Sequence, residues 1–142
     1  MSHLYVYQHN TLMAQPSLWQ GIASICTALC WHTPQVISFV GAGGKTTWIY
    51  ALAQEQRDIG KRVLIVTTTH MKRPTRWGVL TGNRRDIARQ LDAEGIAVVG
   101  IPCENGKITY IGDTLFQEVS PLADSILIEA DGSKRMPLKV FD

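Results

Sequence analysis

A short glycine-rich segment that ends in lysine and threonine is the part of this sequence best suited to chemistry. It follows the apolar run 36–40 and consists of Gly41, Ala42, Gly43, Gly44, Lys45, Thr46 and Thr47. Glycines let successive backbone N–H groups point at one anion, and a helix that begins directly afterwards adds its positive dipole end. In such a loop the lysine contacts the β- and γ-phosphates of a nucleotide, and the first threonine hydroxyl ligates Mg²⁺. The segment therefore predicts a nucleotide phosphate site.

The spacing of this loop departs from the standard pattern G-x-x-x-x-G-K-[ST], whose first glycine would fall on Phe39. The loop is tighter and is similar to the G-T-N-G-K-T-T loop of the Mur-type ligases. A purely structural turn also uses glycine, but the apolar strand before the loop and the helix-compatible run after it favour nucleotide binding. A ligase would need an acceptor-binding domain, for which this chain has no room. A Rossmann dinucleotide site is disfavoured because Lys45 and Thr46 stand where that fold needs a third glycine or alanine.

Two acids follow an apolar run near the end of the chain. Glu129 and Asp131 come after the predicted strand 125–128. A carboxylate at the carboxyl edge of a sheet, beside a phosphate loop, can bind Mg²⁺ or orient an attacking water. We expect Thr46 and Asp131 to bind Mg²⁺, and we favour Asp131 over Glu129 for this role. The alternative is that both acids are ordinary turn residues at a strand terminus.

Other polar residues offer weaker candidates. Thr69 and His70 end the strand that begins at 63, where hydroxyls could hold phosphate or Mg²⁺-bound water and His70 could act as an acid–base group. Threonines also simply favour strands, so both interpretations stay open. Cys26, Cys30 and His32 have the spacing of a metal site, but packing of small residues on a helix explains the two cysteines better.

The pattern of apolar residues predicts an α/β fold with a mostly parallel, P-loop NTPase-like sheet flanked by helices. Continuous apolar runs indicate parallel strands covered on both faces. Helical spacing and capping residues such as Ser17, Gly60 and Gly95 delimit the helices. The expected helices are 18–30, 45 to near 60, 83–94 and 114–119, and the expected strands are 36–40, 63–66, 96–101, 107–111 and 125–128. The strands 96–101 and 107–111 should form a β-hairpin around Glu104, Asn105 and Gly106.

Length and composition limit the class of protein. The 142 residues suit a single nucleotide-binding domain, 1–142, in which residues 1–16 are loosely ordered or form short structure. The net charge of +2 and the lack of a membrane-length apolar run argue against nucleic-acid or membrane binding. Three cysteines and no secretion signal indicate the cytoplasm. Only ten residues follow the turn that ends the last strand at Gly132, too few for a covering helix. Either another subunit covers that face or the fold is incomplete at the C-terminus, and we expect the second.

Three motifs in order carry a family resemblance: Ile37 to Thr47, Val66 to Met71, and Ile128 to Lys139. Together they resemble the YqeC-type proteins, described as accessory or selenium-cofactor biosynthesis proteins for selenium-dependent molybdenum hydroxylases. The resemblance implies a cytoplasmic P-loop protein that helps to install selenium, with the hydroxylase or its maturation factors as partners. It implies phosphate and Mg²⁺ contacts at Gly41, Gly43, Gly44, Lys45, Thr46 and Thr47, and motif roles for Thr69, His70, Glu129 and Asp131. Members usually continue beyond this point, so the resemblance implies the N-terminal part of a longer domain.

The predicted activity is Mg²⁺-dependent nucleoside triphosphate binding with hydrolysis or phosphoryl transfer. Lys45 would offset charge on the phosphoryl oxygens, while Thr46 and Asp131 would hold Mg²⁺. The nucleotide is ATP or GTP, with ATP favoured because the sequence has no N-K-x-D-like guanine-selective segment. One alternative is a nucleotide-sensing binding module without turnover, and another is an inactive truncated fragment.

Overall fold

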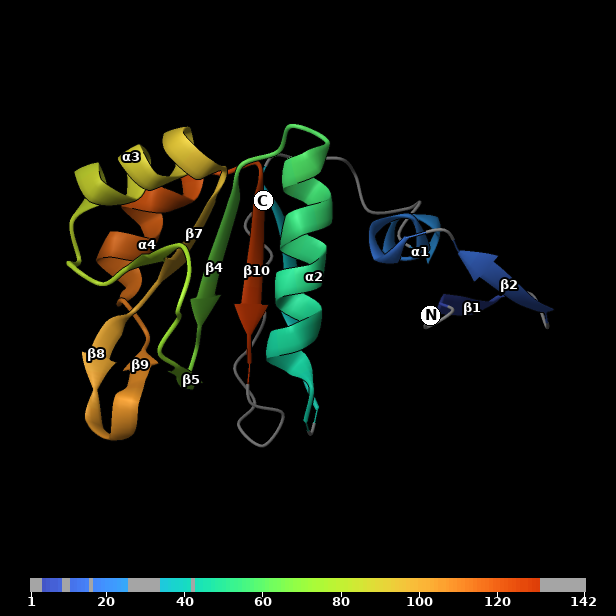
Figure 1. Cartoon of the computed structure of the whole chain (residues 1–142), viewed down its shortest axis with the longest axis horizontal. Coiled ribbons are helices and arrows are strands. Elements are labelled where there is room, and N and C mark those ends of the chain that lie inside the picture. Colours follow the sequence, from blue (N-terminus) through green and yellow to red (C-terminus); the bar gives the residue numbers. More distant parts are fainter. Residues whose placement is uncertain (1–3, 9–10, 16, 26–33, 42, 131–142) are drawn as a thin grey trace.

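The centre of the computed structural model is a five-stranded parallel sheet (Figure 1). The structure describes residues 4–8, 11–15, 17–25, 34–41 and 43–130. The strands lie in the order β3 (Gln35–Phe39), β10 (Ser125–Glu129), β4 (Val63–Thr67), β7 (Ile96–Val99) and β6 (Gly78–Val79). Every neighbouring pair is parallel. The predicted α/β class and mostly parallel sheet are thus confirmed.

Helices cover both faces of this sheet, as its continuous apolar strands predict (Figure 1). On one face Val63 and Ile65 pack in a core with helix α2 (Lys45–Asp58). On the other face Leu64 and Val66 pack with α3 (Arg84–Glu94) and α4 (Asp113–Val119). This alternation follows from the two-residue period of a strand, and it fixes which side of each strand end faces α2.

The helix boundaries lie close to those expected from capping residues. Ser17 Oγ accepts the N–H of Gln20 at 3.1 Å, at the start of α1 (Leu18–Ile25). The side chain of Asn83 accepts the N–H of Arg85 at 2.8 Å and caps α3. Gly95 closes α3 in the left-handed conformation, with φ of 76°. The short 3₁₀ turn η2 (Ser120–Leu122) connects α4 to the last strand.

The predicted hairpin of strands 96–101 and 107–111 is wrong in its first strand. Residues 96–99 belong to β7 in the parallel sheet, whereas β8 (Ile101–Cys103) pairs antiparallel with β9 (Lys107–Thr109). The break falls at Gly100, where an added Cβ would lie 2.6 Å from the Ile108 side chain. Without a side chain there, Ile108 packs directly against the backbone as the chain leaves the sheet. The predicted turn is present as η1 (Glu104–Gly106).

Two short strands lie between β4 and β7 where no strand was predicted. β5 (His70–Lys72) joins β9 and β8 in a small three-stranded sheet with the order β5-β9-β8, and β6 extends the main sheet. Between them, Trp77 is buried against the α2 side of the core with a positive φ of 60°. This segment therefore covers part of a sheet face that a crossover helix would otherwise cover.

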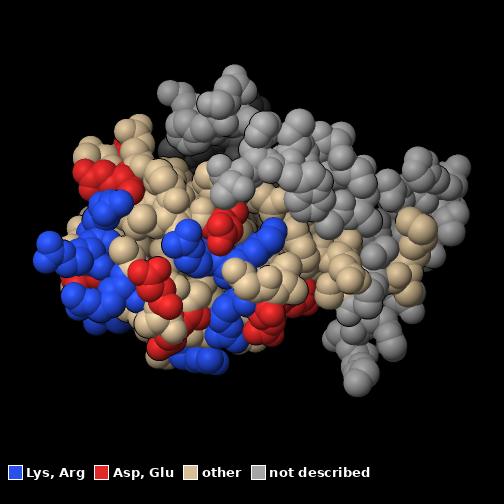
Figure 2. All heavy atoms as spheres, turned by 90° about the horizontal axis from the view of Figure 1, so that it is seen from above, with Lys and Arg blue, Asp and Glu red and all other residues tan. Residues whose placement is uncertain are grey.

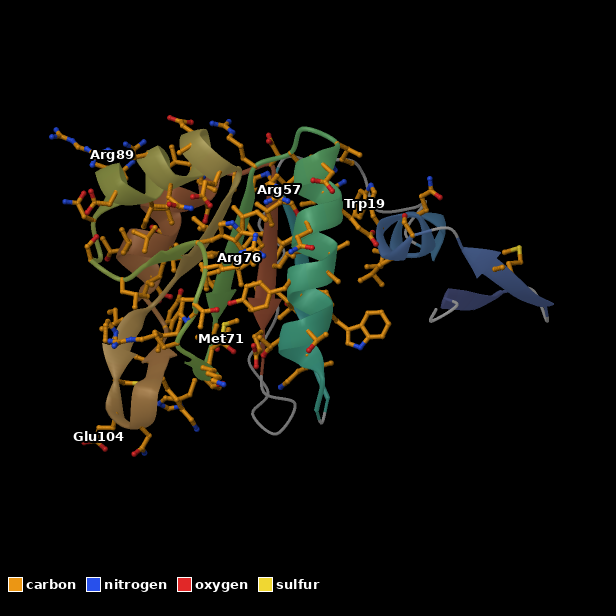
Figure 3. The ribbon with its side chains drawn as sticks, viewed as in Figure 1. Trp19, Arg57, Met71, Arg76, Arg89 and Glu104 are labelled. Atoms are coloured by element: carbon orange, nitrogen blue, oxygen red, sulfur yellow. The ribbon has the colours of Figure 1, made fainter. Side chains whose placement is uncertain are left out.

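In the N-terminal region, α1 packs beside α2, and the hairpin before it packs on α1. β1 (Leu4–Gln8) and β2 (Thr11–Gln15) form an antiparallel hairpin within the stretch expected to be loosely ordered or short. The Glu55 carboxylate, on α2, accepts the N–H of Leu18 at 3.1 Å and of Trp19 at 2.7 Å, which caps α1 (Figure 3). Within the residues described, none of the helices combines the length and apolar character that a membrane crossing needs.

Candidate functional site

The loop between β3 and α2 has the conformation that its glycines permit. Gly41, Gly43 and Gly44 all have positive φ values, of 117°, 76° and 72°. Among the described residues, nothing lies within 4 Å of a Cβ placed at Gly41 or Gly43. Gly44 caps α2 without a side-chain hydrogen bond, and the first turn carries no acid. The helix start therefore leaves backbone N–H groups for an anion. Ala42 lies outside the described residues.

Lys45 and Thr46, the first two residues of α2, both contact the end of β10. The Lys45 ammonium donates to the carbonyl oxygen of Ala130 at 3.0 Å. Thr46 Oγ1 donates to Glu129 Oε2, also at 3.0 Å. Strand register explains this meeting, because Glu129 lies opposite Phe39 on one side and Thr67 on the other. The acid is thus delivered next to the helix start by the neighbouring strand.

The threonines after β4 hold the same strand end from its other side. Thr67 is fully buried and its hydroxyl donates to the Glu129 carbonyl at 3.1 Å, where the Thr68 N–H also donates. The Thr69 N–H in turn donates to Thr67 Oγ1 at 3.2 Å, and Thr109 Oγ1 donates to the Thr69 carbonyl at 2.8 Å. Thr67 therefore positions the backbone that carries Glu129, a role that strand propensity alone does not reveal.

Tyr50 is a neighbour of this site that the sequence analysis missed. It lies one helical turn after Thr46, and residues four apart share a face of a helix. Burial and, to a lesser extent, the charge of Glu129 raise the pKa of Tyr50. Its ring centroid is 5.9 Å from that of Trp77, over which the Arg76 guanidinium lies at 4.2 Å. The four-residue spacing from Thr46 is the sequence signal that could have identified Tyr50.

The other predicted residues do not join this group. His70 begins β5 and is exposed, and no hydrogen bond or ion pair of its side chain occurs within the described part of the chain. Asp131, Cys26, Cys30 and His32 lie outside the described residues. The structure thus brings together Lys45, Thr46 and Glu129, and Thr47 follows them as an exposed residue in the first turn of α2.

Comparison with known families gives a clear relationship. A family model described as "YqeC protein" matches residues 37–142. The chain belongs to the YqeC family. It is 43% identical, over 119 residues, to a protein of Escherichia coli (strain K12) described as "Uncharacterized protein YqeC". The match covers 77% of this chain and 45% of that relative, so the chain spans less than half of the relative's length. No solved structure matches the chain.

The candidate site lies within the part of the chain that the YqeC family model covers. That range includes the glycine loop, the Thr67–Thr69 segment and Glu129, whereas the β1–β2 hairpin and α1 precede it. The contacts between Lys45, Thr46 and the end of β10 are therefore formed entirely by residues of the matched region.

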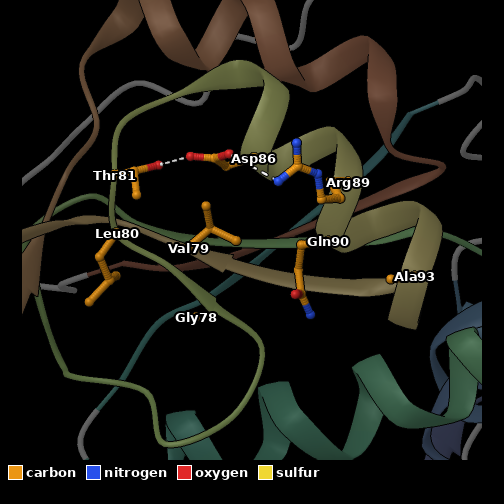
Figure 4. A pocket seen from close by; sticks show the side chains of 8 residues that line it. All are labelled: Gly78, Val79, Leu80, Thr81, Asp86, Arg89, Gln90 and Ala93. Carbon is orange, nitrogen blue, oxygen red and sulfur yellow. Dashed lines mark hydrogen bonds and ion pairs between the residues drawn. The ribbon is translucent and has the colours of Figure 1, made fainter.

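Two alternative kinds of site in this YqeC-family chain are weaker. Among the described residues, no group of three or more His, Cys, Asp and Glu side chains could hold a metal ion. A hollow of about 370 Å³ lies between β6 and α3 (Figure 4). Its polar side chains already have partners, since Asp86 accepts from Thr81 and Gln90 donates to the Ile96 carbonyl. The hollow offers mostly apolar surface and no convergent set of free polar groups.

Proposed function

We propose that this chain binds a nucleoside triphosphate together with Mg²⁺ at the β3–α2 loop. The observation that carries the proposal is the 3.0 Å hydrogen bond from Thr46 Oγ1 to Glu129 Oε2 at the start of α2. It joins a hydroxyl and a carboxylate directly beside a glycine loop whose following helix has no acid in its first turn. Oxygen ligands of this kind suit the hard Mg²⁺ ion.

Each residue has a distinct role in the proposal. Backbone N–H groups of the loop and the first turn of α2 hold the phosphates. Lys45 leaves its Ala130 carbonyl and offsets charge on the β- and γ-phosphates. Thr46 and Glu129 would hold Mg²⁺, together with Asp131 as the motif predicts. When bound, the ion neutralises phosphate charge.

The bound nucleotide is either turned over or sensed. Hydrolysis or phosphoryl transfer is the first possibility, with ATP favoured over GTP. A binding module without turnover is the second, and one argument supports it: Glu129, which contacts Thr46, would hold Mg²⁺ and would then not be free to orient an attacking water. Measuring phosphate release over many turnovers distinguishes the two.

The cellular role in the proposal comes from the family resemblance. It is an accessory role in the cytoplasm, in which nucleotide binding assists selenium cofactor insertion into a molybdenum hydroxylase. Hydrolysis would gate the handover of a selenium species, or a phosphoryl group would activate selenium directly. The hydroxylase or one of its maturation factors is the proposed protein partner.

Titration with fluorescent ATP and GTP analogues, with and without Mg²⁺, tests the proposal. We expect Lys45→Ala to lower affinity about 100-fold, because a charge-assisted phosphate contact is lost. The matched control is Lys107→Ala, which replaces an exposed lysine in β9. This variant should bind nucleotide as tightly as the unaltered chain does. Circular dichroism establishes that all three are folded. The proposal would be contradicted if the folded, unaltered chain did not bind nucleotide. It would also be contradicted if Lys45→Ala bound nucleotide as tightly as the unaltered chain.

A further inference from the structure

The small three-stranded sheet has one face toward the core and one toward solvent. Met71 in β5 and Ile108 in β9 are buried, so their neighbours on each strand point the other way. The strand register then places six residues together on the outward side. We call this side the outer face of the small sheet, and it consists of His70, Lys72, Ile101, Cys103, Lys107 and Thr109.

Positive charge is concentrated on this sheet and the segment that follows β5. Lys72 and Lys107 lie directly opposite each other in the β5–β9 register, an arrangement that disfavours strand pairing. Residues 70–76 and 101–110 contain four Lys and Arg against one Glu, whereas the rest of the chain has ten against eleven. The chain's net positive charge is therefore confined to these two short segments.

The four cations of these segments have no acidic partner among the described residues, a feature that they share with Lys45, Lys61, Arg84 and Arg85. Arg57, Arg62 and Arg89 each form an ion pair with an aspartate. On the side of the molecule seen in Figure 2, basic and acidic side chains are interspersed. Within the described residues, by contrast, no ion pair involves Lys72 or Lys107, or Arg73 and Arg76 beyond β5. An anionic partner that covers Lys72 and Lys107 would offset the repulsion between these two neighbouring cations.

The shape of the outer face indicates what kind of anion fits. It is a sheet surface without an aromatic side chain, so it lacks the stacking platform on which single-stranded nucleic acid binds. Ile101 is 44% exposed and adds an apolar contact between the charges, a mixture typical of protein interfaces. Pro102 removes an N–H from β8, and the strands are short, so strand addition at an edge is disfavoured.

We propose that the outer face of the small sheet docks an acidic surface of a protein partner. Carboxylates of the partner pair with Lys72 and Lys107, and an apolar residue packs on Ile101. The proposal goes beyond nucleotide binding and does not depend on it. The Thr109 hydroxyl, which donates to the Thr69 carbonyl at 2.8 Å, ties this face to the strand-end segment beside Glu129. A docked partner would thus lie next to the candidate nucleotide site.

Fluorescence anisotropy with labelled poly-L-glutamate tests this docking on the full chain. The test variant is Lys72→Glu with Lys107→Glu. The matched control is Arg85→Glu with Arg89→Glu on α3, which changes the net charge equally. We expect the test variant to weaken binding at least about tenfold and the control less than about twofold, because local charge complementarity decides the contact. A short DNA duplex serves as the second probe and should bind more weakly than polyglutamate.

Three results would overturn the proposal. They are no polyglutamate binding by the unaltered chain, equal weakening in the two variants, and tighter DNA binding that depends on the same two lysines. If circular dichroism shows that the charge reversal unfolds the chain, Lys72→Gln with Lys107→Gln replaces it, with the same expected direction. Nucleotide titration of each variant keeps the two proposals separate, since neither lysine belongs to the phosphate site.

Discussion

The two edges of the parallel sheet are held together in different ways. At the amino edge the backbone itself makes the links: Gln35 N–H donates to the Asp124 carbonyl, Val63 N–H to Gly95, and Asp124 N–H to Arg62. Asp124 also accepts the Arg62 N–H through its side chain at 2.8 Å. At the carboxyl edge, backbone links also occur, from Thr68 N–H to Glu129 and from Ala130 N–H to Phe39. Side chains of Lys45, Thr46 and Thr67 add further contacts to the end of β10 there.

The side-chain contacts at the carboxyl edge suit the binding proposed there. Backbone links at the amino edge are part of the fold and cannot be exchanged for contacts to a ligand. At the carboxyl edge, the Lys45 ammonium and the Thr46 hydroxyl can leave a carbonyl and a carboxylate and bind something else. Ligands of open α/β sheets bind at the carboxyl ends of strands, and here the kinds of contact at the two edges give the physical reason.

The largest expected effect is at the carboxyl edge. Glu129→Gln keeps an oxygen that can accept from Thr46 but removes the charge proposed to hold Mg²⁺. We expect Mg²⁺-dependent nucleotide affinity to fall about 30-fold, or about 2 kcal/mol. The melting temperature should change by less than about 2 °C. Nucleotide titration and thermal denaturation measure these two quantities.

The control for this prediction is Glu104→Gln, the same chemical change in the exposed hairpin turn. It should alter neither nucleotide affinity nor melting temperature. If Glu129→Gln binds nucleotide with unchanged Mg²⁺ dependence, Glu129 is not part of a metal site. The contacts of Glu129 would then give no support to nucleotide binding at the carboxyl edge.

At the amino edge we expect a smaller effect, which lowers stability and leaves nucleotide affinity unchanged. Asp124→Ala removes the carboxylate that accepts the Arg62 N–H, so the free energy of unfolding should fall by about 1 kcal/mol. Nucleotide affinity should not change. Urea denaturation measures the loss, and Asp92→Ala, which removes only an exposed 3.8 Å ion pair, should cost less than about 0.5 kcal/mol. Equal losses in both variants would show that the side-chain cap contributes nothing.

The smallest effect concerns a contact away from both edges. Burial, and then the hydrogen bond and charge of Asp113, raise the pKa of Tyr110 to about 12 from 10.0. Because the folded state holds this proton more tightly, the resulting stability is complete below pH 10 and is lost as pH rises toward 12. The unaltered chain should therefore lose more stability across this range than Tyr110→Phe does.

Two measurements check the tyrosine prediction. Urea denaturation at several alkaline pH values compares the unaltered chain with Tyr110→Phe. Tyrosinate absorbance of Asp113→Ala should show one tyrosine titrating closer to its usual pKa, since this change removes both the hydrogen bond and the charge of Asp113. Parallel pH curves for the unaltered chain and Tyr110→Phe would contradict the assignment.

Local signals account for the elements that could be predicted. Long apolar runs predicted β4 and β7, whose residues are all buried. Capping residues predicted the start of α1 and the end of α3. β5 and β6 have only three and two residues, too short for any periodicity to show. The division of 96–103 into two strands also escaped prediction, because it depends on Ile108 packing over Gly100.

By itself, the sequence determined a glycine loop between a strand and a helix, with Lys45 and Thr46 at the helix start. These are local properties, since the positive φ values and the helix start depend on adjacent residues. Only the tertiary structure decided that Thr46 meets Glu129, 83 positions away, because β10 inserts between β3 and β4. The same holds for Lys72 opposite Lys107, where strand register joins two residues that are unremarkable apart. The sequence predicted an acid of the last strand beside the loop but favoured Asp131, because the exact register between distant strands is a property of the whole fold.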